Sequence, residues 1–469
     1  MRRGRGVLFL ACLLTPLVCG ALLGDCGLRK DDFVKVSKNG FDAADNAEDF
    51  NDYPWSMTFY TPDGETEGHV YVGTGNNFAG IGDYVYQNGA NLDGIPFRPA
   101  EIRRHRPDLG ERDWERVYDT REEGGPFQTS GFRSLRPYRA ESDGELYLYA
   151  GSFGADASLY RSPTGDPGTW ERVFQTDKPG AIRGLEEHNG LLYFSTTVLD
   201  LIDEDFETPE GKIYATDGET FWPVIEDGFG NPNNLESIVL RSFDGWLYAG
   251  TRNKVDGFEI WKFAGPAEGD EAPVPIVLQG GADARNESAG TALVFHDRLY
   301  FGTLIFGGLI NLIERGVKGA DLLRIAPDDT WENVVGKDGI SGMGPGFDDP
   351  RNAYLWSLAE FDGWLYAGTW DDSVIAVGAL VNLPLIPGLI SGEINPTDAR
   401  DVPPGFLAFA GSLGGDLYKS KDGVHWTNVF NRGLGNHNNY GIRTMDSASG
   451  RLYLGFANPY DGLEIWRSK

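Results

Sequence analysis

The amino-acid sequence predicts an all-β fold, and more closely a seven-bladed β-propeller with four-stranded blades. Three observations lead to it: a strand motif that recurs seven times, further strands that follow each copy, and a last repeat that ends one strand short. Glycine accounts for 64 of the 469 residues, and aromatic residues make up 13%. This composition, with few long segments of helical periodicity, is typical of many short strands joined by turns.

The recurring strand motif combines an apolar residue, a tyrosine and a small fourth residue. Its first copy reads Val70-Tyr71-Val72-Gly73. The seven copies begin at Val70, Leu148, Leu192, Leu247, Leu299, Leu365 and Leu452. Five of them closely follow a turn such as Asp244-Gly245, whose residues tolerate positive φ. Each motif strand should therefore form a hairpin with the strand before it.

Two more strands follow most copies of the motif. One resembles Glu259-Ile260-Trp261, and the next contains a tryptophan and a valine, as in Trp426 with Val429. Together with the strand before the motif, this gives four strands in a unit of about 45 residues. Such units are the blades of a propeller, so seven units predict seven blades.

The last repeat stops at Lys469, directly after its third strand. The segment 33–40, which precedes the first repeat, has the pattern of the missing outer strand. Pairing it beside residues 464–467 would close the ring and cover an exposed sheet edge. We therefore expect one domain over residues 21–469, with residues 33–40 as the outer strand of the last blade.

One turn of the repeat points to a known superfamily. Residues 420–426, with the sequence Ser-Lys-Asp-Gly-Val-His-Trp, resemble an Asp-box, and residues 215–222 and 162–170 resemble degenerate copies. The resemblance is to the sialidase-like Asp-box (BNR-repeat) propellers, and it implies the propeller fold. A typical sialidase has six blades and a Phe-Arg-Ile-Pro motif, from which residues 132–135 differ, so the resemblance does not imply sialidase activity.

The first 20 residues are typical of an export signal. Arg2, Arg3 and Arg5 precede an apolar stretch over residues 7–18, and small residues follow at a cleavage position. The stretch is shorter than the roughly 20 apolar residues that cross a membrane. We therefore predict a secreted or periplasmic protein. A lipid anchor on Cys19 is the less favoured alternative, because Val18 stands where a small residue should precede the lipidated cysteine.

The cysteines and the net charge exclude several classes of protein. Cys12, Cys19 and Cys26 are the three cysteines, and cleavage after residue 20 would leave one of them and no internal disulfide. The formal charge of −29 repels nucleic acid, which we exclude as a partner. Solubility, a saline habitat and Ca²⁺ on loop carboxylates all remain explanations of the acidity, and no metal ligand is assigned.

Long insertions fall on one face of the predicted propeller, which we call the top face. They cover residues 75–100, 198–210, 304–320 and 371–409, and glycine- and asparagine-rich blade connections share this face at 228–234, 344–352 and 433–439. Loops on a rigid scaffold commonly carry function. Two stretches, 304–313 and 374–391, are strongly apolar, which indicates either a small satellite core or a contact with a protein, a membrane or an apolar ligand.

Counting back nine residues from each motif leucine, or fifteen in the first two repeats, gives one repeat position near the top of the channel. Its occupants are Trp55, Arg133, Arg183, Ile238, Gly290, Trp356 and Arg443. Arginine suits carboxylate, sulfate or phosphate, and tryptophan faces suit sugar rings. We therefore expect these three arginines and two tryptophans to bind an anionic saccharide. Alternatively, they pack between blades and pair with Glu186, Glu187 or Asp446.

His437 lies in a top-face connection, close in sequence to Tyr440 and Arg443. These residue types could supply an acid, a base and charge neutralisation for β-elimination from a uronic acid, although a solvated histidine is the simpler reading. The sequence thus favours an extracytoplasmic protein that binds an anionic polysaccharide or carboxylate ligand. If it is an enzyme, we expect a polysaccharide lyase first and a glycoside hydrolase second. The alternatives are a non-catalytic interaction module and an enzyme for an apolar small molecule beneath the apolar loops of blades five and six.

Overall fold

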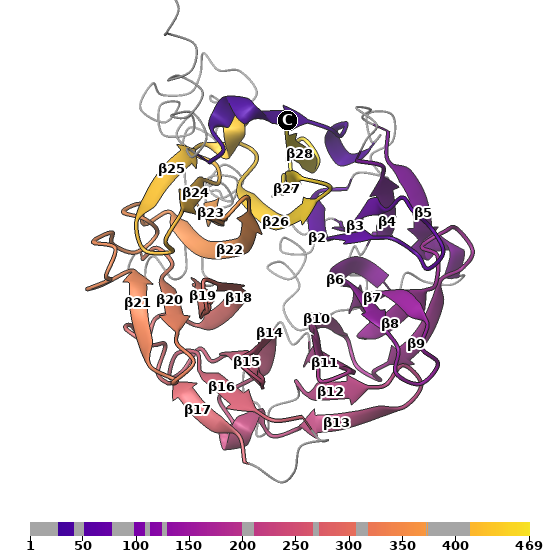
Figure 1. Ribbon diagram of the computed structural model, residues 1–469, viewed down its shortest axis with the longest axis horizontal. Helices are drawn as coiled ribbons and strands as arrows, with labels where there is room; N and C mark the ends of the chain where they lie inside the picture. Colours follow the sequence, from indigo (N-terminus) through magenta and orange to yellow (C-terminus); the bar gives the residue numbers. More distant parts are fainter. Residues whose placement is uncertain are drawn as a thin grey trace, which may run out of the picture.

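The computed structural model describes residues 27–41, 51–76, 98–107, 113–123, 129–198, 211–265, 272–305, 318–371, 373 and 413–469. The strands of these residues form two antiparallel sheets, of 16 and 12 strands. Short 3-10 helices cover Lys30–Asp32, Asn39–Phe41, Thr120–Glu123, Gly228–Gly230 and Gly433–Gly435. Figure 1 shows the strands arranged in groups around a central axis. The all-β prediction is confirmed, and the arrangement is that of a β-propeller-like fold.

Most groups consist of four strands that are consecutive in the chain and pair antiparallel. They are β2 (Tyr53–Tyr60), β3 (His69–Gly75), β4 (Glu101–His105) and β5 (Glu115–Asp119); β6 (Thr129–Arg139), β7 (Leu146–Gly154), β8 (Ser158–Ser162) and β9 (Glu171–Gln175); β10 (Gly180–His188), β11 (Leu191–Val198), β12 (Ile213–Thr216) and β13 (Phe221–Ile225). The next are β14 (Glu236–Phe243), β15 (Trp246–Arg252), β16 (Ile260–Phe263) and β17 (Val274–Val277); β18 (Ser288–Phe295), β19 (Arg298–Leu304), β20 (Leu322–Ile325) and β21 (Trp331–Val335); β22 (Asn352–Phe361), β23 (Trp364–Asp371), β24 (Leu417–Ser420) and β25 (Trp426–Phe430).

The last group takes its fourth strand from the other end of the chain. It contains β26 (Gly441–Ala448), β27 (Arg451–Ala457), β28 (Glu464–Ser468) and β1 (Phe33–Lys35). β1 pairs antiparallel with β28, with Phe33 opposite Ser468 and Lys35 opposite Trp466. The Phe33 ring packs edge-on against Phe430 at 5.8 Å, and Lys35 Nζ lies 2.8 Å from the Glu464 carboxylate.

The first two strands of each group form a hairpin, as the sequence predicts. In β14 and β15, Phe243 faces Trp246, and the turn between them has positive φ at Asp244 (47°) and Gly245 (79°). Two successive residues with positive φ define the type I′ turn, which matches the twist of paired strands. The second strand lies inside the sheet and is covered on both faces, so its apolar residues are buried: Leu247, Tyr248 and Ala249 are at most 1% exposed.

The small fourth residue of the motif allows neighbouring groups to pack closely. A Cβ atom added at Gly250 would lie 2.6 Å from the Cβ of Ala289 in the next group. A Cβ atom added at Gly455 would lie 2.9 Å from Cγ of Pro54, so the last group packs closely against the first. The hydrophobic core consequently lies between neighbouring groups, where Tyr248 and Ala292, for example, belong to one buried cluster. Each group therefore needs its neighbours to bury its apolar faces.

Candidate functional site

Each first strand contains a β-bulge at the same level. In β2, Pro54 faces Thr74 and Ser56 faces Gly73, so Trp55 has no partner in the ladder. The corresponding unpaired residues of the other first strands are Arg133, Arg183 with Gly184, Ile238, Gly290, Trp356 and Arg443. These are the residues that counting along the repeat selects. Bulges redirect side chains out of the regular pattern, so the repeat position is a bulge position.

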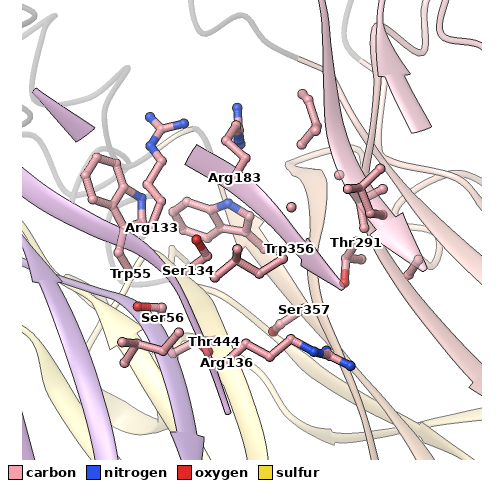
Figure 2. Close-up of a pocket in the computed structure, with 18 of the residues that line it drawn as sticks. Trp55, Ser56, Arg133, Ser134, Arg136, Arg183, Thr291, Trp356, Ser357 and Thr444 are labelled. Atoms are coloured by element: carbon pink, nitrogen blue, oxygen red, sulfur yellow. The ribbon is translucent and has the colours of Figure 1, made fainter. Parts of the chain in front are cut away.

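The bulges gather the predicted binding residues around one cavity. The cavity has a volume of about 240 Å³ and is lined by Trp55, Arg133, Arg183, Ile238, Gly290, Trp356 and Arg443, with residues farther along the same strands. In Figure 2, Arg133 and Arg183 point toward one side of it, and Arg136 lies toward the other. We call the first side the upper part of the channel, and we call Arg133, Arg183 and Arg443 the arginine site.

Side-chain hydroxyls next to the bulges hold the arginine site in place. The Ser56 hydroxyl donates a hydrogen bond to the Phe132 carbonyl of the neighbouring group at 2.8 Å. The Ser357 hydroxyl donates in the same way to the Ile442 carbonyl at 2.7 Å. Both carbonyls belong to the residue before an arginine of the site. The backbone of these arginines is therefore anchored before any ligand arrives, which is the preorganisation that a binding site needs.

Two of the arginines lie on tryptophan rings. The guanidinium carbon of Arg133 lies 4.4 Å from the centre of the Trp55 ring, and that of Arg443 lies 5.2 Å from the centre of Trp356. The Trp55 indole is 4% exposed, and it lies over Gly131 and Gly75. Trp55 therefore packs against Arg133 and the glycine backbone, and its predicted contact with a sugar ring stays a prediction. Trp356 is partly exposed and supports Arg443 in a similar way.

The arginine site carries positive charge in an environment that disfavours it. Burial, together with the charges of Arg183 and Arg443, lowers the pKa of Arg133 well below its usual value. Burial and the charge of Arg183 lower the pKa of Arg443 to about 9, so it remains charged at neutral pH. Burial also lowers the pKa of Arg183, against the opposing effect of Glu236. An anion between these groups would stabilise all three charges.

The carboxylate closest to the arginine site differs from those expected as partners. Arg183 Nη1 lies 3.7 Å from Glu236, which also pairs with Arg252 at 3.3 Å. Glu236 begins β14, and the sequence analysis missed it because a partner on a neighbouring strand is not visible in the spacing of one strand. Of the predicted partners, Asp446 instead accepts a hydrogen bond from the backbone N–H of Phe59 at 3.0 Å.

A second layer of charge lies in the lower part of the channel. Glu186 is 4% exposed and pairs with Arg136 at 2.8 Å and with Arg241 at 3.4 Å. These three residues stand three places beyond the bulge residues of β6, β10 and β14. Counting three residues on from the first repeat position would have found them. We call them the lower arginine–glutamate cluster.

The structure does not bring His437 and Tyr440 into a shared site. His437 is exposed, whereas Tyr440 is fully buried. The Tyr440 ring packs among Tyr53, Trp356 and Trp370, each at 5.9 Å between ring centres. Its hydroxyl is buried and has no hydrogen-bond partner in the described part of the chain. His437 and Tyr440 therefore face different surroundings, and they do not form the acid–base pair that the sequence suggested.

The asparagines of the glycine-rich connections support the fold. The Asn439 side-chain amide donates to the Gly433 carbonyl at 3.1 Å and to Glu464 at 2.9 Å. Asn234 and Asn352 repeat this arrangement, with Gly228 and Glu259, and with Gly346 and Asp416. Each asparagine thereby ties a connection between strand groups to the start of a third strand. These amides are committed to the protein and are not free for a ligand.

Several predictions fall on residues that the structure does not describe. They are the export signal with Cys12, Cys19 and Cys26, most of the long insertions, the stretch 304–313 beyond residue 305, and the stretch 374–391. In the described ranges, no group of three or more His, Cys, Asp or Glu side chains is placed to hold a metal ion, and Ca²⁺ stays a prediction. No helix in those ranges has the length and apolar character to cross a membrane.

Comparisons with known proteins identify no family. No family model matches the chain, and no curated protein matches it. A solved structure from a study of two prolyl endopeptidases aligns with 89% of this chain at 12% identity and a TM-score of 0.42. This chain spans half the length of that protein. The computationally designed protein Ika8 aligns with 89% of this chain and 97% of its own, at 9% identity and a TM-score of 0.38. Scores this low support no functional argument.

Proposed function

We propose that this chain is an exported seven-bladed β-propeller whose arginine site binds the anionic group of a polysaccharide or a related carboxylate ligand. The seven strand groups are its blades, and β1 closes the ring. The pairing of β1 with β28 and the close approach of Gly455 to Pro54 support closure. Export to the periplasm or the cell exterior rests on the predicted signal at residues 1–20.

The outer turns support membership of the Asp-box superfamily. The Asp422 carboxylate accepts hydrogen bonds from the backbone N–H groups of Val424 and His425, both at 2.8 Å. Asp217 accepts from the N–H groups of Glu219 and Thr220 in the equivalent turn of another group. In both turns the aspartate holds the loop before a fourth strand. This is a structural role, and it leaves the channel as the place for a ligand.

The observation that carries the proposed function is the convergence of three arginines on one cavity in a strongly acidic protein. The formal charge of the chain is −29, yet the cavity is lined by five arginines and one glutamate among the described residues. Carboxylate, sulfate and phosphate are the groups that arginine binds best. A partly buried cluster of like charges is unfavourable without an anion, so its presence favours a binding role.

The size of the cavity indicates which part of a ligand it binds. Its volume of about 240 Å³ is below the roughly 300–1,000 Å³ typical of sites for drug-sized ligands. A single charged sugar unit or a small organic acid suits this space better than the length of a polymer. We therefore expect the arginine site to recognise the charged end of a saccharide chain.

The geometry supports binding more than cleavage. β-Elimination needs a base within hydrogen-bond reach of the proton that it removes. His437 is exposed and Tyr440 is buried. A third candidate, Tyr53, contacts the Trp55 and Trp356 rings. Burial and the charge of Asp52 raise the pKa of Tyr53 well above its usual value. The proposed function is consequently that of a binding protein, with lyase activity as the second outcome that the experiment detects.

The test is a binding panel read by calorimetry and by absorbance of unsaturated uronate ends. The panel contains uronate-containing and sulfated oligosaccharides, with neutral oligosaccharides of equal length. We expect the anionic members to bind and the neutral members not to bind. Arg183→Gln should weaken binding about tenfold or more, because it removes a charged hydrogen-bond donor. Glu236 would keep its pair with Arg252, so the fold should tolerate this substitution.

Arg139→Gln is the matched control. Arg139 lies on the same strand as Arg133, but it is exposed and pairs with Asp63 at the surface. Removing it changes the net charge of the protein equally and should leave the affinity unchanged. Equal loss of affinity in both variants, or no binding by any anionic saccharide, would overturn the proposed function. Rising absorbance would add cleavage to it.

A further inference from the structure

The positive charge of the channel is distributed unevenly between its two parts. In the lower arginine–glutamate cluster, two arginines share one buried carboxylate: Glu186 accepts from Arg136 and Arg241, and its other oxygen accepts from the backbone N–H of Ser242 at 3.1 Å. Arg241 also donates to the Ala292 carbonyl, at 2.9 Å from Nη2. This cluster is thus largely satisfied by the protein itself.

The upper part of the channel is different, because two of its arginines have no carboxylate partner among the described residues. Arg183 and Arg252 share Glu236. Arg133 and Arg443 have no carboxylate partner within the described residues. Their Nε atoms are buried and have no hydrogen-bond partner there.

The two arginines without a carboxylate lie on two different indoles, both of which contact one tyrosine. Arg133 rests on Trp55 and Arg443 rests on Trp356. The Tyr53 ring contacts both indoles, 5.9 Å from the centre of Trp55 and 6.1 Å from the centre of Trp356. One point charge on a ligand would be poorly placed to satisfy both guanidinium groups. Two charges at different positions on the ligand would suit both.

From this arrangement we infer that the ligand of the arginine site is a dianion, with one negative group for Arg133 and one for Arg443. This inference rests on the proposed function and specifies its ligand class: a sugar diacid, a sulfated uronate or a comparable doubly charged group. A monoanion would leave one partly buried guanidinium unpaired, and partial burial of an unpaired charge is unfavourable.

The experiment compares matched pairs that differ by one charge. Glucarate and gluconate share a six-carbon sugar-acid chain and carry two and one carboxylates. Glutarate and valerate form the second pair, with five carbons each, two carboxylates and one, and no hydroxyl groups. Affinities for the full chain are measured by calorimetry at constant ionic strength, because screening by salt would otherwise change with the ligand. We expect each dianion to bind at least tenfold more tightly than its monoanionic partner.

Two variants connect this preference to the named residues. Arg443→Gln and Arg133→Gln should each reduce the ratio between dianion and monoanion toward one, whereas Arg139→Gln should retain the wild-type ratio. Thermal melting and circular dichroism establish that each variant is folded. Reduced ratios in both site variants with an unchanged control would support the assignment.

The failures of the two proposals are distinguishable. Equal affinities within both pairs would overturn the dianion inference and leave anion binding intact. Binding of uronate oligosaccharides without binding of either small dianion would overturn it as well. If no anion binds, the oligosaccharides included, the proposed function falls together with the inference. A preference for the dianion in the glucarate pair alone would identify sugar diacids as the ligand class. A preference in both pairs would show that the two negative charges are sufficient for recognition.

Discussion

The guanidinium carbon of Arg133 lies 4.4 Å from the centre of the Trp55 ring, although the two residues come from neighbouring strand groups. Both stand at bulges, Trp55 in β2 and Arg133 in β6. Gly131, two residues before the arginine, faces Gly75 across the two groups and leaves room for the indole between them. The orientation of the arginine therefore depends on a glycine and a tryptophan that never need to touch the ligand.

Gly131→Ala should weaken anion binding without changing any charge. The added methyl group would overlap the Trp55 ring, and the displaced indole would no longer support Arg133. A cation–π contact contributes about 0.5–2 kcal/mol, depending on its exposure. We expect a loss of affinity of about fivefold to tenfold for glucarate, measured by calorimetry.

A double-mutant cycle supplies the control for this effect. In a Trp55→Leu background, Gly131→Ala should cause little further loss, because the ring that it displaces is already gone. Additive losses in the double variant would show that Gly131 acts through something other than the indole. The same cycle with Arg139→Gln should show no coupling.

Sequence reasoning found the repeat position of the site because a repeat preserves spacing. Trp55, Arg133 and Arg443 could be aligned without knowing that each stands at a bulge. It missed Glu236, because the ion pair with Arg183 joins two neighbouring strands, and spacing within one strand does not reveal it.

The spacing also grouped Tyr440 with His437 and Arg443 as a candidate acid–base set, whereas Tyr440 directly precedes β26 and turns inward among other aromatic rings. Spacing in a loop gives no direction for a side chain. The direction of Tyr440 is determined instead by Tyr53 and Trp356, which are distant in sequence. Contacts of this kind set the limit of what the pattern could predict about the site.

Glu186→Gln should destabilise the fold by about 3 kcal/mol, the lower end of the range for breaking a buried ion pair. Glu186 is 4% exposed, and the substitution leaves Arg136 and Arg241 facing each other without a carboxylate. Urea denaturation followed by tryptophan fluorescence measures the change. Glu145→Gln, an exposed residue in the turn between β6 and β7, should change stability by less than about 0.5 kcal/mol. An equally small effect at Glu186 would mean that solvent satisfies the two arginines.

Phe33→Ala should destabilise the protein by about 3 kcal/mol, in the range for a large-to-small change in a core. Phe33 is 6% exposed and packs on Phe430, although it belongs to a strand of three residues. Val274→Ala is the comparison, since Val274 is 41% exposed on the outer strand β17. If Phe33→Ala were as mild as Val274→Ala in thermal and urea unfolding, β1 would contribute little to holding the last blade.

Asp446 should make the stability of the protein decrease between about pH 4 and pH 6. Burial raises the pKa of Asp446 to about 6, against the opposing effect of its hydrogen bonds from the Ser447 and Phe59 backbone. In the unfolded chain its pKa is about 3.9. Between these two values the folded protein holds the proton more tightly than the unfolded chain does. The stabilisation is therefore present at acid pH, and it is lost as the pH rises through 6.

Asp446→Asn should remove this contribution, because asparagine does not titrate. The substitution also removes one oxygen acceptor, and this lowers the free energy of unfolding by an amount that does not depend on pH. The informative quantity is therefore how the difference in stability between variant and wild type changes with pH. Relative to wild type, the variant should gain up to about 2 kcal/mol between pH 4 and pH 8, a value reduced from the full pKa shift because Asp446 keeps some contact with solvent. Thermal melting across this range measures the gain, and parallel pH profiles for the two proteins would show that Asp446 titrates normally.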